Sequence, residues 1–588
     1  MRSSKLKSVL AMVLAVLMVV SLAACAPAAT SSVAGGSTSS AAGTPSTGAT
    51  SSEAGGDDLY YNREGLPIVK EAIDVTMMSV SDYTKDWTNT YLFKWIGEKM
   101  GINITCQMYT QDTIKQQYAL LLQSDELPDI PWWATGSMEE INEGYYLALD
   151  PYIEDGLMPN LLKLYEETPE AEALFKKADG KTYGFGNVRT DIVTRVLRHD
   201  AINTEWLKAV GKEVPTTLDE LYEVLVAFRD QDPNGNGQPD EIPMSFTYDT
   251  ARSGERMTWN LRASFGLFST ALSYMLVADK DGKVFLGEAS ENGKAYYKYL
   301  NKLYEEKLLD NELFSHSDDE YKEKIRKGVV GFFDTWGSTC QQLSDNKEEW
   351  PSIAEKWVMP GTFKSEWNDS QAIMIYNGAA SGGVCISAKT EYPEALVRMF
   401  DYFLCEEGQI QYSYGTENVT FQWKEVAPGI KAPSCDIPEY IKAAGYETMN
   451  DYQIQYVRPS NFFTHYSYNA VNSVLKDYVA DKDLKSILEL KKYPDTVNNA
   501  IQAEALANYG VCYNYPMVSY TAEQSEARAQ LQTDVNNYIS TMKVQFITGE
   551  KDIDTEWDGY MAELKKMGLE DLLKIEQEAY DDYQALFN

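Results

Sequence analysis

The order of strand-like and helix-like stretches near the start of the chain constrains its fold more than any other feature. IDVTMMSV, Ile73–Val80, has the β-branched content of a strand. Thr90–Gly101 places apolar residues at helical spacing and ends in a glycine, and Ile102–Tyr109 alternates like a second strand. A second helix and a short third strand follow, up to Ile130. This order predicts a parallel α/β layer, and the pattern recurs after Asp191.

The N-terminus has the features of an export signal. Basic residues precede the apolar run Val9–Val20, and SLAAC follows it and ends at Cys25. The apolar run is too short to span a bilayer, so we expect a secretory signal peptide over residues 1–24. The ending LAAC is similar to the lipobox of bacterial lipoproteins, in which the cysteine becomes the lipidated first residue. Residues 25–58 are mostly Ala, Ser, Thr, Gly and Pro, which predicts a flexible stalk on a lipid-anchored Cys25.

The composition excludes several classes of function. A length of 588 residues is enough for two or three domains. The formal net charge of −36 disfavours nucleic acids and anionic membrane surfaces, because phosphates are bound by Lys and Arg. The three histidines lie far apart and show no zinc-ligand spacing, so neither a zinc site nor a Ser/His or Cys/His catalytic pair is expected.

The acidic segment RDQDPNGNGQPDEIP, Arg229–Pro243, has the spacing of a calcium loop. Calcium takes six to eight oxygen ligands from a tightly wound backbone, and glycines permit the winding. One possible register begins at Asp230 and matches the whole EF-hand pattern, with Glu241 as its last ligand. The other begins at Asp232 and needs the adjacent Asp240 and Glu241 to close the shell. The alternative to a metal site is a turn rich in Asp, Asn and Gly.

Several stretches in a fixed order resemble the large family-1 extracellular solute-binding lipoproteins of ABC importers. The longest is Val196–Pro243, with EWL, PTTLDELY and the acidic loop. Others are LLLQSDELPDI, DGKTYGF, DTWGS, YGTENVTFQW and the run from Phe546 to Leu573. In the alginate-oligosaccharide-binding members the calcium ligands match the register that begins at Asp232. The resemblance therefore implies a structural Ca²⁺ site formed by Asp232, Asn234, Asn236, Gln238, Asp240 and Glu241. Asp230 is the alternative ligand.

The resemblance also implies an α/β, two-lobed fold of periplasmic-binding-protein type II, with a cleft between the lobes and extra C-terminal helices. Hinges are expected near Phe185–Val193 and Gly382–Ile386. Lobe one would comprise residues 59–188 plus 385–430. Lobe two would comprise residues 189–384 plus 431–588, including the calcium loop 232–241.

A cleft that binds sugars needs aromatic platforms for the apolar ring faces and polar side chains for the hydroxyl rim. Ligands of open α/β sheets lie beyond the C-terminal ends of strands, where aromatic residues follow three predicted strands. By its position after PDI, Trp133 resembles the sugar-stacking Trp of maltose-binding relatives, although the following TGS departs from their acidic residue. The ligand-binding candidates are Asp86, Trp87, Trp132, Trp133, Trp259, Arg262, Trp336, Tyr376, Trp423 and Arg458.

We therefore expect a monomeric receptor, anchored by lipid outside the cell membrane, that passes a carbohydrate to a permease without chemistry of its own. A receptor for a peptide or another solute is the first alternative. A secreted glycoside hydrolase with two catalytic carboxylates is the second. A hydrolase would shorten the bound sugar, whereas a receptor would return it intact. A calcium-dependent adhesin is a third.

Overall fold

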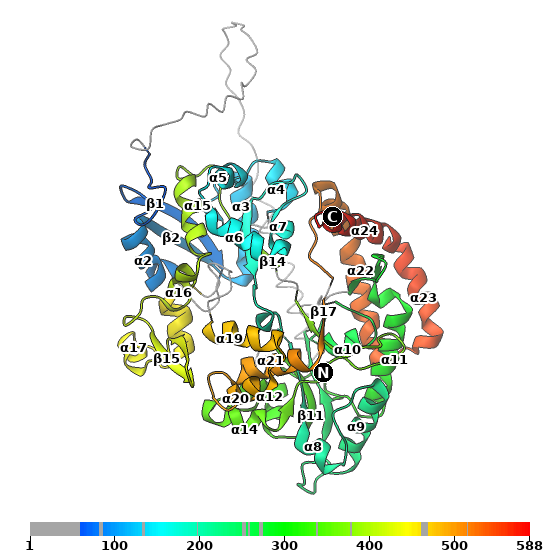
Figure 1. The fold of residues 1–588 in the computed structure, drawn as a ribbon. Coiled ribbons are helices and arrows are strands. Elements are labelled where there is room, and N and C mark those ends of the chain that lie inside the picture. The colour runs from blue at the N-terminus through cyan, green and yellow to red at the C-terminus, as the bar shows by residue number, and fades with distance from the viewer. Residues whose placement is uncertain are drawn as a thin grey trace, which may run out of the picture. The chain divides into compact units, whose positions relative to one another are not determined.

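The three strands predicted first form a sheet of their own. β1 (Ile73–Val80) lies between β2 (Ile102–Tyr109) and β3 (Ile130–Pro131), and both pairings are parallel. The helices α2 (Tyr91–Met100) and α3 (Gln111–Ser124) connect them. Gly101 ends α2 in the left-handed conformation, with φ of 81°, which glycine adopts without a steric penalty. The predicted parallel α/β layer is thus confirmed, and we call the elements around it lobe one (Figure 1).

The structure, a computed structural model, describes residues 59–80, 86–131, 136–196, 198–249, 254–256, 259–269, 275–336, 339–376, 379–459, 469–513 and 515–587. The chain divides into two units, Met1–Leu59 and Tyr60–Asn588. The predicted signal peptide 1–24, Cys25 and the stalk 25–58 lie outside the described residues. Among the helices that are described, none combines the length and the hydrophobicity needed to cross a bilayer.

Lobe two is organised around a second sheet, in the order β12-β5-β11-β6. β11 (Val330–Trp336) is parallel to β6 (Ile242–Ser245) but antiparallel to β5 (Arg198–Asn203), and β12 (Trp357–Val358) is also antiparallel to β5. The expected recurrence of an all-parallel layer is therefore wrong for this lobe. Apolar periodicity does not reveal on which side of a later strand, or in which direction, β5 pairs.

The two segments predicted as hinges pair with each other. β4 (Gly184–Val188) and β14 (Ala379–Cys385) form an antiparallel two-stranded sheet with a bulge between Ala380 and Val384. A Cβ at Gly184 would lie 2.7 Å from the carbonyl oxygen of Val384, so only glycine allows the two backbones to approach this closely.

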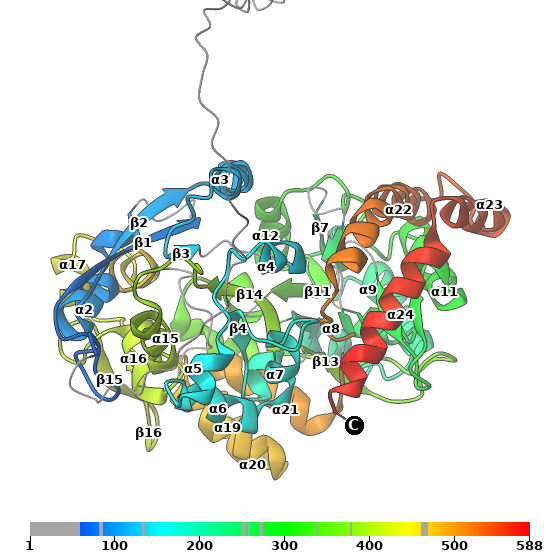
Figure 2. The ribbon, with the colours of Figure 1, turned by 90° about the horizontal axis from the view of Figure 1, so that it is seen from above.

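The remaining elements fill both lobes and add the C-terminal helices (Figures 1 and 2). Further helices of lobe one are α4 (Met138–Asn142), α5 (Asp150–Glu154), α6 (Pro159–Glu167), α7 (Pro169–Phe175), α15 (Pro393–Tyr402) and α16 (Glu406–Tyr414). Further elements of lobe two are α8 (Thr204–Ala209), α9 (Leu218–Asp230), β7 (Thr247–Asp249), β8 (Gly254–Arg256), α10 (Trp259–Ala263), β9 (Leu276–Ala278), β10 (Val284–Leu286), α11 (Glu291–Glu305), α12 (Asp318–Arg326), α13 (Thr339–Leu343), α14 (Trp350–Ala354) and β13 (Ala372–Ile375). The C-terminal part contains β15 (Gln422–Ala427), β16 (Ile430–Ser434), α17 (Pro438–Ala443), α18 (Met449–Asp451), a π-helix (Tyr452–Val457), α19 (Ala470–Ala480), α20 (Leu484–Leu490), α21 (Val497–Asn508), β17 (Gly510–Tyr513), α22 (Ala522–Thr548), α23 (Ile553–Lys566) and α24 (Leu569–Ala585).

Part of the C-terminal region packs on lobe one, which differs from the expected boundary at residue 430. Cys435, Ile441 and Tyr452 are buried in one cluster with Phe421, beside side chains of α16. Tyr456 also lies 6.4 Å, between ring centroids, from Tyr91 of α2. The side on which an amphipathic helix docks depends on long-range packing, which its own sequence does not encode.

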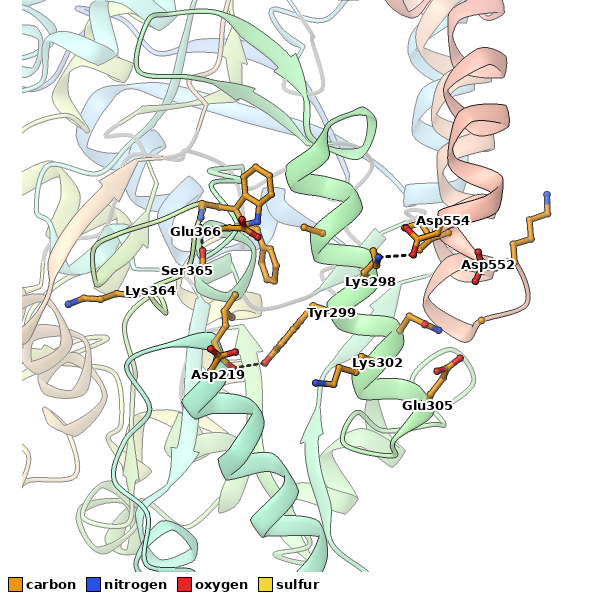
Figure 3. A pocket seen from close by; sticks show the side chains of 18 residues that line it. Asp219, Lys298, Tyr299, Lys302, Glu305, Lys364, Ser365, Glu366, Asp552 and Asp554 are labelled. Carbon is orange, nitrogen blue, oxygen red and sulfur yellow. Dashed lines mark hydrogen bonds and ion pairs between the residues drawn. The ribbon is translucent and has the colours of Figure 1, made fainter.

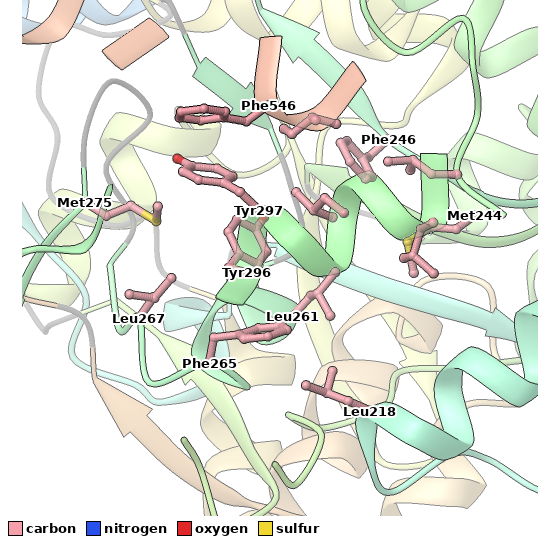
Figure 4. Close-up of a cluster of buried hydrophobic side chains, with 14 of the residues drawn as sticks. Leu218, Met244, Phe246, Leu261, Phe265, Leu267, Met275, Tyr296, Tyr297 and Phe546 are labelled. Atoms are coloured by element: carbon pink, nitrogen blue, oxygen red, sulfur yellow. The ribbon is translucent and has the colours of Figure 1, made fainter. Parts of the chain in front are cut away.

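The largest core of lobe two joins segments that are distant in sequence. Tyr296 and Tyr297 of α11 lie near Phe546 of α22, and Phe265 and Met275 close the same cluster (Figure 4). The last three helices therefore complete the core of this lobe.

We expect Gly331→Ala to destabilise the protein by about 1–3 kcal/mol, because this core has no space for another methyl group. A Cβ at Gly331 would lie 2.5 Å from the ring of Phe228 and 2.6 Å from that of Trp206. Gly559→Ala is the matched control, since no atom lies within 4 Å of its Cβ and it is inside α23, where alanine favours the helix by up to about 1 kcal/mol. Urea-induced unfolding measures both, and equal stability of the two variants would contradict the packing described.

Candidate functional site

The three strands of lobe one end at one edge of their sheet, and the predicted ligand residue Asp86 follows β1. Because β1, β2 and β3 are parallel, Val80, Tyr109 and Pro131 end at the same side of the sheet. Asp86 lies shortly after β1 and is exposed, and its carboxylate accepts a hydrogen bond of 2.9 Å from the backbone N–H of Thr88. This edge is where ligands of open α/β sheets bind.

In lobe two, the start of β5 meets the end of β11. Arg198 pairs in register with Trp336, and Asp200 pairs with Asp334. These four positions lie on one face of the sheet, because successive residues of a strand alternate between faces. The Trp336 side chain is outside the described residues.

Arg198, Asp200 and Asp334 form a buried charge cluster at this strand edge. Arg198 Nε donates to Asp334 Oδ2 at 3.1 Å, and the two side chains are 5% and 0% exposed. The hydroxyl of Tyr321 donates to the backbone oxygen of Asp334. A small hollow of about 160 Å³ opens beside the ion pair and is also lined by Thr247.

Asp200 is the least satisfied member of this cluster. It is 1% exposed, and within the described part of the chain neither of its carboxylate oxygens has a hydrogen-bond partner. Burial raises the pKa of Asp200 to about 7, although the charge of Arg198 and the nearby amide of Asn260 oppose this shift. Asp200 is therefore a buried carboxyl group beside the ion pair, whereas Arg198 and Asp334 line the hollow.

The acidic loop winds tightly between α9 and β6. Asp232, Gly235 and Gly237 adopt left-handed φ values of 46°, 70° and 73°. The two carboxylate oxygens of Asp232 accept from the backbone N–H groups of Asn236, at 3.1 Å, and Gly237, at 3.0 Å. Asp240 accepts from the side-chain amides of Asn234 and Asn236 at 3.0 to 3.2 Å.

Two further acidic residues distinguish the possible registers of this loop. Glu241 Oε1 is buried and has no hydrogen-bond partner among the residues described. Burial raises the pKa of Glu241, and the nearby carboxylates of Asp232 and Asp240 raise it further. Asp230, by contrast, is held by Arg229, whose Nε and Nη2 donate to its two oxygens at 2.7 and 3.0 Å. The described residues contain no group of three or more His, Cys, Asp or Glu side chains that could hold a metal ion as they stand.

The candidate site thus consists of two strand edges, one in each lobe, and a separate acidic loop. A profile described as bacterial extracellular solute-binding protein matches residues 92–429. The chain belongs to this family. The two-lobed fold and the extracellular character of the family agree with the expectations from the sequence.

The fructooligosaccharide ABC transporter substrate-binding protein FusA of Streptococcus pneumoniae is similar over nearly the whole chain. It is 27% identical over 542 residues, which cover 89% of this solute-binding protein and 93% of FusA. The structure of FusA in complex with kestose gives a TM-score of 0.65 at 25% identity and covers 87% of this chain and 100% of FusA. A structure of a FusA EF-hand mutant in complex with fructo-nystose gives the same values. The alginate-binding protein AlgQ2 without calcium ion, at 21% identity and a TM-score of 0.60, covers 87% of this chain and 99% of its own, and supports the fold.

Three predicted ligand residues of this solute-binding protein lie in its core. Trp87 is 0% exposed, Trp259 2% and Arg262 1%. In this structure they leave no ring face or guanidinium edge for a ligand, so their assignment as cleft residues is not supported. Trp87 starts a 3-10 helix (Trp87–Asn89) that turns into α2, and Trp259 packs edge-to-face on Tyr376 with centroids 5.1 Å apart. A lone Trp after a strand does not reveal from its sequence which way the ring turns.

The other predicted ligand residues fall in separate places. Tyr376 is half-buried directly after β13. Trp423 lies in the β15–β16 hairpin beside Phe421, and Arg458 lies 5.4 Å from the ring of Tyr412. Trp132 and Trp133 lie outside the described residues. The structure therefore does not join the predicted residues into one surface.

The sequence interpretation missed Arg198, Asp200 and Asp334. The signal that could have found them is charge inside strand-like runs, RHDAIN and GFFDTW. Charged side chains in buried strands are rare unless they are paired or functional.

A larger pocket of about 780 Å³ lies elsewhere in lobe two, beside α11 (Figure 3). None of the predicted ligand residues lines it. Lys298 on α11 and Asp554 on α23 form an ion pair of 2.7 Å within it, and the hydroxyl of Tyr299 donates to the backbone oxygen of Leu218 at 3.2 Å. Its lining mixes charges of both signs, so its electrostatics select neither an anion nor a cation.

Proposed function

We propose that this protein is the substrate-binding component of an ABC importer, which captures an oligosaccharide between its lobes and releases it intact to a permease. The observation that carries this proposal is the similarity to FusA, which is named for fructooligosaccharides and covers nearly the whole chain. The hollow beside the ion pair of Arg198 and Asp334, at the strand edge of lobe two, is compatible with it. The receptor has no chemistry of its own.

The proposed ligand surface combines both strand edges. Asp86, Trp132 and Trp133 would contribute from lobe one, and Trp336 and Tyr376 would contribute from lobe two beside the charge cluster. Trp423 and Arg458 are retained as candidates at the border of the C-terminal hairpin. The aromatic rings would cover the apolar faces of the sugar, and the carboxyl, amide and guanidinium groups would bond its hydroxyls.

A thermal-shift screen of residues 59–588 tests this function. Neutral and uronic oligosaccharides are added in the presence of calcium, and each ligand that raises the melting temperature is recovered and sized. A ligand that stabilises by mass action and returns uncut supports the receptor. A shortened sugar would indicate a hydrolase, and stabilisation by peptides alone would make this a peptide receptor.

We further propose that the acidic loop holds a structural Ca²⁺ in the register that begins at Asp232. The donor set fits, because Glu241 Oε1 is buried without a hydrogen-bond partner among the described residues and the carboxylates of Asp232 and Asp240 lie near this side chain. Asn234, Asn236 and Gln238 would supply the remaining oxygens. The ion pair of Asp230 with Arg229 favours this register over the one that begins at Asp230.

Removal of calcium by a chelator is expected to lower stability by about 1–4 kcal/mol, the mass-action range for a ligand at 10 to 1,000 times its dissociation constant. Calorimetry with and without chelator measures the effect. Asp240→Asn should weaken the response, whereas the matched Asp230→Asn should keep it. The reverse ranking of these variants would assign the other register, and an unchanged melt in excess chelator would remove the site.

The proposed localisation outside the cell membrane rests on residues 1–24 and Cys25. We propose that the signal is cleaved before Cys25, that lipid on Cys25 anchors a monomer outside the membrane, and that residues 25–58 hold lobes one and two away from the bilayer. In the full-length protein, Cys25→Ser should abolish lipid labelling and release the protein from the membrane fraction. Retention of the lipid label by this variant would contradict the anchor.

A further inference from the structure

A row of tyrosines forms a groove beside the last helix. The groove encloses about 260 Å³. Its lining includes Phe268, Tyr513, Tyr515, Tyr580, Tyr583 and Gln584, and we call it the tyrosine groove. Figure 2 shows α24, which carries its last three residues, running to the C-terminus.

The rings of the groove are held in place by contacts on the protein side. Tyr515 and Tyr580 stack with centroids 5.5 Å apart and an interplanar angle of 23°. The backbone N–H of Tyr515 donates to the oxygen of Phe268 at 3.0 Å, and its hydroxyl donates to the backbone oxygen of Glu576 at 3.3 Å. Rings that are ordered before binding lose little conformational freedom when a ligand arrives.

Exposed apolar side chains occur in and near the groove. Tyr513 lines it, and Phe587, which is also exposed, packs on Tyr583 with ring centroids 5.1 Å apart. Val511, Met517 and Leu586 are exposed as well and lie within two residues of the lining in sequence. Tyr513 is 51% exposed, so part of its side chain is accessible to a ligand.

The rim of the groove adds polar groups. A second hollow of about 630 Å³ shares Tyr580 and Gln584 with it and is lined by Asp279, Asp281 and Asp581. Flat rings beside carboxylates and an amide are the combination that sugar rings require, since C–H faces stack on the rings and hydroxyls bond the rim. A concave surface of this size fits a chain of small rings better than the broad face of a protein partner.

The groove begins at the strand edge where the ligand surface is proposed to end. Tyr513 is the last residue of β17 and pairs in parallel register with Ile375, which directly precedes Tyr376. Phe268 packs on the same small cluster as Trp259 and Tyr376. At the other side, Tyr583 lies near Glu170 of α7 in lobe one; burial, followed by this carboxylate, raises the pKa of Tyr583 to about 12.

We propose that the tyrosine groove is an extension subsite, which holds the sugar units of an oligosaccharide that project beyond the strand edges. The inference rests on the proposed receptor function and adds a preference for chain length. An oligosaccharide long enough to reach Tyr513 gains contacts that a shorter oligosaccharide lacks.

Titration calorimetry with a length series tests this inference on the calcium-loaded protein, residues 59–588. The probes are kestose and inulin-type chains of about six to eight units, with xylo-, malto- and galacto-oligosaccharide series of the same lengths alongside. We expect the wild type to prefer the long chain of the series it binds. The combined Tyr513→Ala and Tyr583→Ala variant should reduce this long-to-short affinity ratio about tenfold, as two lost ring contacts imply.

Two controls separate stacking from a folding defect. Tyr513→Phe keeps the ring and should keep the affinity ratio, and Tyr513→Ala alone, at an exposed position, should unfold at the same urea concentration as the wild type. An unchanged ratio in the double variant would overturn the extension subsite while the receptor function stands. If the wild type binds no member of the four series, both the function for neutral oligosaccharides and this inference fail.

Discussion

Arg198→Ala is expected to lower the free energy of unfolding by about 3–5 kcal/mol, because it leaves the carboxylate of Asp334 buried without its partner. Arg198 and Asp334 are 5% and 0% exposed, so the carboxylate left behind has little contact with solvent. The same substitution removes the positive charge that lowers the pKa of Asp200, so the buried carboxylate of Asp200 also loses a favourable electrostatic interaction. Urea-induced unfolding, followed by far-ultraviolet circular dichroism at pH 7, measures the loss.

Two further variants test whether the expected loss of stability comes from the burial of the ion pair. The ion pair of Arg63 with Asp155 has a similar geometry at 2.8 Å but is 45% and 55% exposed, and Arg63→Ala should lose less than about 1 kcal/mol. Arg198→Met combined with Asp334→Leu should recover most of the stability, because well-packed apolar residues replace a buried pair at little cost. A loss in Arg198→Ala as small as that in Arg63→Ala would show that the strand edge is hydrated.

Asp200→Asn is expected to stabilise the protein above pH 7 by up to about 4 kcal/mol. The pKa of Asp200 is about 7 in the folded state, whereas an unfolded Asp titrates near about 3.9. Between these values the folded state binds the extra proton, so the wild type loses stability as the pH rises from about 4 to 7. The amide does not ionise, so the advantage of the variant should be full above pH 7 and vanish below about pH 4. Unfolding free energies measured from pH 4 to 8 give this dependence.

Asp401→Asn is the matched control for this prediction. Burial also raises the pKa of Asp401, to about 6, but its carboxylate accepts from the backbone N–H of Leu161 at 2.9 Å and from Asn160. Its substitution should therefore lower stability by about 1–3 kcal/mol, because bonds to a charged acceptor are lost. A gain in Asp401→Asn similar to that in Asp200→Asn would mean that burial alone, and not the missing partners, determines the effect.

The opposite signs expected for Arg198 and Asp200 point to the role of this strand edge. A buried carboxyl group without a hydrogen-bond partner lowers stability, and such groups persist mainly where function needs them. Loss of oligosaccharide affinity in Asp200→Asn together with the gain in stability would connect the charge cluster to the proposed ligand surface.

Local elements could be predicted from the sequence because their signals are local. β1 begins and ends at Ile73 and Val80 as predicted, since β-branched residues favour the extended backbone. α2 lies within the predicted Thr90–Gly101, where apolar spacing and a terminal glycine mark the helix. The tight winding of the acidic loop also follows from its local sequence, because Gly235 and Gly237 adopt left-handed angles without a steric penalty.

The orientation of side chains could not be predicted in the same way. Trp87 follows a strand in the sequence, yet its ring lies wholly inside the protein. Whether a ring enters the core depends on the helices packed over it, and these lie far away in the chain. The order β12-β5-β11-β6 is nonlocal for the same reason, since pairing direction depends on which strands meet after the connections close.

The sequence by itself determined the family, the first α/β layer and the spacing of the acidic loop, because these depend on residues near one another or on a recognisable order of motifs. Only the tertiary structure decided that Arg198 meets Asp334, 136 positions away, and that Tyr513 shares a groove with Tyr580 and Tyr583. The ion pair depends on the register of the strands, and the groove depends on the packing of the C-terminal helices against lobe two. Both are properties of the folded chain as a whole, so no single stretch of the sequence contains them.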